Sequence, residues 1–119
     1  DGVAPSIGLA QNAIKDIMSE QTPIPVTVEK IISEVGRTYS VSPEDIRSTK
    51  QTANVSLPRQ VAMYIVHEVT GLTMVKIGAE FGGRNHATVV YGISKVEKLI
   101  DTDTHLHELI DDIVKNVKN

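Results

Sequence analysis

Apolar residues recur along this chain at steps of three and four, the spacing of helices that each bury one face. No segment alternates apolar and polar residues for long enough to predict a sheet. The β-branched run 88–91 falls inside a helical repeat. With 119 residues, 40% of them hydrophobic and 23% charged, the chain can form an apolar core of its own. The pattern therefore predicts an all-α fold.

Apolar stripes and capping residues predict the bounds of these helices. Thr22–Pro25 predicts an extended linker, because each proline disfavours a helical residue before it, and Thr27 is the predicted cap of the helix that follows. Residues 48–56 have no period and predict a loop, and Pro58 is predicted to open the helix that ends at Gly71. Helices are expected over about 6–20, 27–38, 58–71, 73–81, 85–100 and 103–117, with one short turn after Ser42-Pro43.

The predicted helix 58–71 separates its residues into two faces. Its core side holds Val61, Ala62, Ile65, Val69 and the following Leu72. Its outer side, predicted to be polar and exposed, holds Arg59, Gln60, Met63, His67 and Thr70.

Composition and motifs exclude several classes of function. The chain has no cysteine, so disulfides and thiolate metal sites are excluded, and aromatics at 3% with no Trp argue against stacking on single-stranded nucleic acid. No apolar run approaches the roughly 18 residues of a membrane helix. No phosphate-cradling glycine loop and no set of nucleophile, base and orienting group is visible, so we expect no enzyme activity and no cofactor. His105 and His107 are spaced poorly for a zinc pair and are expected on the surface. The start at Asp1 without Met or a signal-peptide pattern suggests a fragment of a longer protein.

The net charge of −3 is unevenly distributed. Residues 46–100 carry seven Lys/Arg and three Asp/Glu, a net charge of +4, while residues 1–45 and 101–119 carry −4 and −3. A basic middle suits a surface that faces phosphates. Chance clustering of surface charge remains the alternative.

The helices predicted at 73–81 and 85–100, joined through Gly82-Gly83, have the order of a helix-turn-helix. Asn85 is the predicted cap of the second helix. Small residues near its start would allow close approach to a major groove, and lysines further along would meet phosphates. A solvated helix face would look similar. The predicted outer face comprises Ala87, Thr88, Tyr91, Ser94, Lys95 and Lys98.

Two motifs, LPRQVAM at 57–63 and IGAEFGGRNHATVV at 77–90, closely resemble the DNA-binding domain of the DnaA family of bacterial replication initiators. The resemblance covers about 25–118, and residues 5–20 resemble the last helix of the AAA+ lid that precedes this domain in the family. It implies an end of the lid with a linker over 1–25 and a Trp-repressor-like helix-turn-helix domain over 26–119.

The resemblance implies binding of double-stranded DNA at the repeats of the replication origin called DnaA boxes. The recognition helix 85–100 would lie in the major groove, and the loop before the Pro-Arg-Gln motif would reach the minor groove. The implied DNA-binding residues are Lys50, Gln51, Arg59, Gln60, His67, Met74, Val75, Arg84, Asn85, His86, Ala87, Thr88, Tyr91 and Lys95.

Three positions and one loop depart from the family pattern. Asn85 stands where the family commonly has Asp, and its amide both donates and accepts, so base discrimination there is expected to relax. Ala87 replaces a Thr and keeps a methyl for thymine. His67 replaces a Lys, which weakens a phosphate contact at neutral pH. The basic loop is reduced to Arg47 and Lys50, with Gln51 beside them.

For the full-length protein, the resemblance implies ATP and Mg²⁺ in an absent AAA+ domain. It also implies contacts with other DnaA subunits and replisome-loading proteins, an acidic-phospholipid contact for which Lys15 gives weak support, and a place on the bacterial nucleoid in the cytoplasm. An alternative is a protein-interaction module of the same fold with weakened DNA binding. In that alternative, an exposed apolar surface of Met63, Met74 and Val75 would meet the partner.

Overall fold

The structure is a computed structural model that describes residues 24–118, and all of its regular elements are helices. No strand occurs among these residues, which confirms the all-α prediction. The predicted helix at 6–20, with Lys15, lies outside the described residues. The helices are α2 (Ile24–Tyr39), α3 (Pro43–Arg47), α4 (Ala53–Thr70), α5 (Met74–Glu80), α6 (His86–Thr102) and α7 (Thr104–Lys118).

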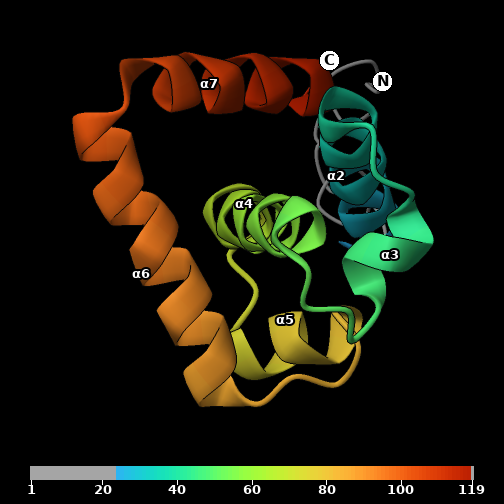
Figure 1. Cartoon of the computed structure of the whole chain (residues 1–119). Coiled ribbons are helices and arrows are strands. Elements are labelled where there is room, and N and C mark those ends of the chain that lie inside the picture. Colours follow the sequence, from blue (N-terminus) through green and yellow to red (C-terminus); the bar gives the residue numbers. More distant parts are fainter. Residues whose placement is uncertain (1–23, 119) are drawn as a thin grey trace, which may run out of the picture.

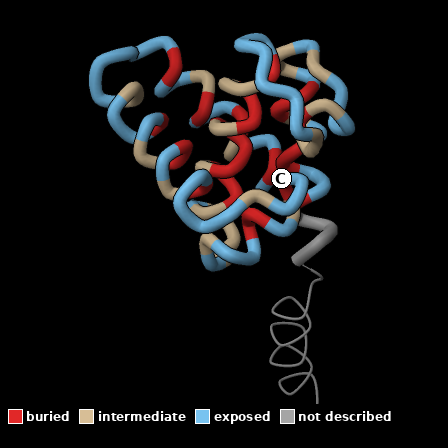
Figure 2. The backbone as a smooth tube through the Cα atoms, turned by 60° about the horizontal axis from the view of Figure 1, so that its bottom comes forward, coloured by how far each residue is buried: buried red, intermediate tan, exposed pale blue. Residues whose placement is uncertain are grey.

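Helix α4 is the centre of the fold and contacts each of the other five described helices. Figure 1 shows α2, α5, α6 and α7 arranged around it, with α5 and α7 at opposite ends of the view. Figure 2 shows the buried stretches, in red, gathered towards the middle of the fold, with exposed stretches around them. Within residues 24–118, no helix is both long and apolar enough to cross a membrane.

The start of α2 differs from the prediction. The helix begins at Ile24, so Ile24 and Pro25 belong to it instead of to an extended linker, and Thr27 lies inside it instead of capping it. Proline fits the first turn of a helix because the N–H that it lacks has no helical acceptor there. The predicted end near Thr38 is confirmed to within one residue.

The start of α4 is also earlier than predicted. The helix begins at Ala53 after the N-cap Thr52, so the loop predicted over 48–56 is wrong at its end, and Pro58 lies inside the helix. Proline has a helical φ but leaves the carbonyl four residues earlier without a donor. Val55 and Pro58 are both buried, and this packing supports the additional turn against that loss.

The remaining caps agree with the sequence. Ser42 caps α3 by accepting a hydrogen bond from the Asp45 backbone N–H at 3.1 Å, and Gly71 ends α4 in the left-handed conformation. Thr73 caps α5. The apolar stripe of α7 packs inward: Leu106, Ile110, Ile113 and Val117 are buried, and Leu109 is partly buried.

The turn between α5 and α6 brings the two helices close together. Gly82 and Gly83 have φ of 81° and 76°, which glycine adopts without the steric cost that a side chain brings. The Gly78 carbonyl accepts hydrogen bonds from the backbone N–H groups of Gly83 and Arg84, both at 3.0 Å. These bonds fix the position at which α6 begins.

Candidate nucleic-acid interface

The outer face of α6 is open to solvent, as the sequence predicts. His86, Ala87, Thr88 and Lys95 are exposed, and Tyr91 is 64% exposed, unusually high for a large apolar side chain. On the opposite face, Val89, Gly92, Ile93 and Val96 are buried. The face available for a ligand is therefore the one that carries small residues near its start and lysines further along.

Asn85 supplies the first contact of this helix. Its side-chain Oδ1 accepts a hydrogen bond from the Thr88 backbone N–H at 2.8 Å, as predicted for an N-cap. The acceptor oxygen is therefore engaged within the protein.

We expect Asn85→Ala to lower the free energy of unfolding by about 1 kcal/mol, because the Thr88 N–H loses its acceptor. Asn85→Asp keeps an acceptor oxygen and adds a negative charge at a helix N-terminus, so its stability should match or exceed that of the native chain by up to about 1 kcal/mol. Urea denaturation followed by circular dichroism measures both changes. An equal loss in the two variants would contradict the capping role.

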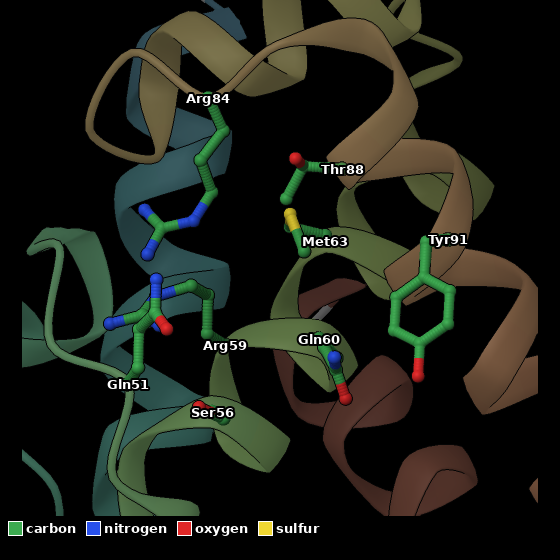
Figure 3. A pocket seen from close by; sticks show the side chains of 8 residues that line it. All are labelled: Gln51, Ser56, Arg59, Gln60, Met63, Arg84, Thr88 and Tyr91. Carbon is green, nitrogen blue, oxygen red and sulfur yellow. The ribbon is translucent and has the colours of Figure 1, made fainter.

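Between α4, α6 and the loop that precedes α4 lies a pocket of about 230 Å³. Figure 3 shows Arg84 extending from the turn before α6 towards Arg59 and Gln51, with Thr88 and Tyr91 along the opposite wall. The lining residues are Gln51, Ser56, Arg59, Gln60, Met63, Arg84, Thr88 and Tyr91. The pocket thus joins predicted site residues from three separate segments of the chain.

Two guanidinium groups give this pocket a positive charge. Burial, together with the nearby positive charge of Arg84, lowers the pKa of Arg59 to about 10, against the opposing effect of the Asp45 carboxylate. Burial also lowers the pKa of Arg84. With a pKa of about 10, the Arg59 guanidinium still carries its positive charge at neutral pH. The two positive charges at the pocket favour an anionic ligand there.

Arg59 does not lie on an exposed polar face, and that prediction is wrong. Its residue exposure is 3%. Its guanidinium donates hydrogen bonds to three backbone carbonyls: Nε to Ile46 at 2.7 Å, Nη1 to Lys50 at 2.6 Å and Nη2 to Asp45 at 2.9 Å. The periodicity of α4 could not reveal this, because the acceptors belong to α3 and the following loop.

Met63 is also buried, with 1% exposure, so the predicted exposed surface of Met63, Met74 and Val75 does not form as a unit. Gly92 on α6 leaves room for it, since a Cβ there would lie 2.8 Å from the Met63 Cε atom. Met74 is half-buried against the core, and Val75 is 65% exposed.

The positive charges of the loop region have intramolecular partners that the sequence did not reveal. Lys50 Nζ lies 3.0 Å from Asp45 Oδ1. Arg47 donates to the Glu80 carbonyl at 2.8 Å and also pairs with the carboxylates of Glu80 and Glu29. Arg47 therefore fastens α3 to the end of α5, and its charge is neutralised there.

The polar residues of α4 lie at different places relative to the pocket. Gln60 is half-buried and lines it, and its Oε1 has no hydrogen-bond partner among the described residues. His67 lies further along the helix, where its Nδ1 is 3.7 Å from Glu68 Oε2. His105 and His107 are exposed, as predicted, and residues 24–118 contain no group of three potential metal ligands.

Comparison with known proteins identifies the family. A family model described as Bacterial dnaA protein helix-turn-helix matches residues 28–96, more than half of the chain. A solved structure described as a DNA replication initiation factor superposes with a TM-score of 0.73 at 24% sequence identity, over 94% of this chain and 35% of that one. At this identity the likeness shows the shared fold, and the chain spans little more than a third of that protein. The chain belongs to the bacterial DnaA protein helix-turn-helix family, whose helix-turn-helix is a non-catalytic DNA-binding domain.

Proposed function

We propose that this domain binds double-stranded DNA in a sequence-specific manner at DnaA boxes of a replication origin, with α6 in the major groove. The observation that carries the proposal is the exposed outer face of α6 beside a pocket with two guanidinium groups. An exposed helix whose first residues are small can approach base edges. Asn85, His86, Ala87 and Thr88 would then lie nearest the bases, and Tyr91 and Lys95 nearest the backbone.

The loop before α4 and the start of α5 would extend this interface. Gln51 is exposed at the edge of the pocket, and Lys50 would leave its ion pair with Asp45 to reach DNA in the minor groove. Exposed ion pairs contribute at most about 1 kcal/mol, so a phosphate can replace the carboxylate. Val75 and Met74 would meet the DNA from α5, and His67 would contact a phosphate.

The wider context of the chain is also a proposal, based on family membership. We propose that residues 1–23 form the end of an AAA+ lid with its linker. The DNA-binding domain then begins with α2 at Ile24, two residues before the boundary at 26 that the sequence predicts. The full-length protein would bind ATP and Mg²⁺, assemble with further DnaA subunits and replisome-loading proteins, contact acidic phospholipids, and act on the nucleoid in the bacterial cytoplasm.

We expect a DnaA-box duplex to bind well above a scrambled duplex, and the affinity to fall steeply with salt, by about 0.9 log units per log unit of salt for each phosphate contacted. Lys95→Ala should weaken both duplexes and reduce that slope by about one contact. Lys115→Ala removes the same charge from an exposed position of α7 and should leave the salt dependence of binding unchanged. Fluorescence anisotropy at several salt concentrations measures these quantities.

Equal affinity for box and scrambled duplexes would contradict sequence-specific binding. The internal neutralisation of Arg47 and Lys50 favours one second candidate, a protein-interaction module with weakened DNA binding. Titration of the chain with box DNA, followed through backbone amide shifts, separates the two. Shifts over residues 84–95 support DNA recognition, and their absence supports the second candidate.

A further inference from the structure

We propose that Arg59 acts on DNA recognition as a positioning residue, which holds the loop 48–51 so that Lys50 and Gln51 face the DNA, instead of contacting phosphate itself. This inference rests on the proposed function and names a specificity-determining role within the same site. It arises from the burial of a residue whose position in the sequence predicts an exposed contact.

The contacts of Arg59 account for each of its three guanidinium nitrogens. Nε donates to the Ile46 carbonyl and Nη2 to the Asp45 carbonyl, both in the last turn of α3. The Asp45 carbonyl also accepts from Ser48. Nη1 donates to the Lys50 carbonyl beyond that turn. One planar group thus connects the end of α3 with the loop that follows it.

The other hydrogen bonds of the loop are local. Ser48 bonds back to the Asp45 carbonyl through its backbone N–H at 3.1 Å and its hydroxyl at 2.7 Å, and Lys50 N–H donates to the Ser48 hydroxyl at 3.1 Å. Thr52 caps α4 without a side-chain hydrogen bond. Within residues 24–118, the bond from Arg59 to the Lys50 carbonyl is therefore the one hydrogen bond that ties residues 48–51 to α4.

The hydrogen bond from Arg59 to the Lys50 carbonyl fixes the backbone position from which the neighbouring side chains extend. Gln51 follows the anchored Lys50 carbonyl directly and lines the same pocket as Arg59 (Figure 3). A loop released from Arg59 would have to be ordered again when DNA binds, and ordering even one backbone residue is unfavourable enough to weaken binding about tenfold. Discrimination between bases should therefore be lost at the base pairs that the loop faces and kept at the base pairs that α6 faces.

Arg59→Lys tests the inference, because lysine keeps the positive charge but cannot span three carbonyls with one ammonium group. We expect box affinity to fall about tenfold, with base discrimination lost at the loop end of the box and kept at the α6 end. In a chain that already carries Lys50→Ala and Gln51→Ala, Arg59→Lys should cause no further loss of affinity, because the loop then has no DNA-contacting side chain to position. Arg37→Lys, at an exposed arginine of α2 paired with Glu34, is the matched control and should bind like the native chain.

Thr49→Gly provides a second variant if Arg59→Lys fails to fold. Thr49 is exposed in the same loop, and glycine there increases the disorder of the free loop without removing an Arg59 bond. We expect a smaller loss at the same base pairs. Native-like affinity of Arg59→Lys with an unchanged salt slope, or a loss that persists without Lys50 and Gln51, would overturn the positioning role. Equal binding of box and scrambled DNA by the native chain would instead overturn the proposed function, and this inference with it.

Discussion

Replacing Phe81 by alanine should lower the free energy of unfolding by about 3–5 kcal/mol, the range measured when a buried aromatic side chain is truncated. Phe81 is fully buried and is the largest side chain in the interior of the described domain. It also ends α5 directly before Gly82-Gly83, so the cavity would open beneath the turn of the helix-turn-helix. Since domains are stable by only about 5–15 kcal/mol, this loss would remove a large part of the total.

Urea denaturation followed by far-UV circular dichroism measures the change, and Val75→Ala on the same helix is its control. Val75 is largely exposed, so its truncation should change stability by no more than about 0.5 kcal/mol. A loss under about 1 kcal/mol for Phe81→Ala would mean that the interior beneath the turn is not packed as described.

The sequence predicts most of the helices because each buries one stripe of apolar residues against the others. Helix α7 is the clearest case: Leu106, Ile110 and Ile113 repeat at helical spacing, and all three are buried. Local signals mark a boundary well where a side chain caps the helix, as Asn85 does for α6. They fail at the starts of α2 and α4, where a proline lies within the helix. At α4, the buried Val55 and Pro58 support the earlier start.

The outer face of α6 was predictable because exposure there depends on the period of a single helix. The environment of Arg59 and Met63 was not, because each is buried by a different segment. The carbonyls of α3 and its loop converge on Arg59, and α6 approaches Met63 at Gly92. A helical wheel of α4 contains neither segment. Glycine at 92 is a signal of close approach, but it does not identify the residue that approaches.

Gly78→Ala is expected to destabilise the domain by about 3 kcal/mol, at the upper end of the usual range for overpacking. Helix propensity predicts the opposite sign, because alanine is favoured over glycine inside a helix by about 1 kcal/mol. The contact decides the outcome: a Cβ on Gly78 would lie well under 3.0 Å from the backbone carbonyl oxygen of Arg84. That carbonyl cannot move away freely, because the N–H groups of Gly83 and Arg84 are both bonded to the Gly78 carbonyl.

Gly83→Ala is the matched control, since it changes the same turn by the same methyl group. Gly83 has a φ of 76° but nothing within 4 Å of an added Cβ, so the variant loses only about 1–2 kcal/mol for the left-handed backbone. Urea denaturation should therefore rank Gly78→Ala below Gly83→Ala in stability. Box affinity should fall more for Gly78→Ala, because displacing Arg84 moves the start of α6. An equal loss of unfolding free energy in the two variants would contradict this argument. It would mean that backbone conformation, and not the close contact between α5 and Arg84, decides which residues this turn accepts.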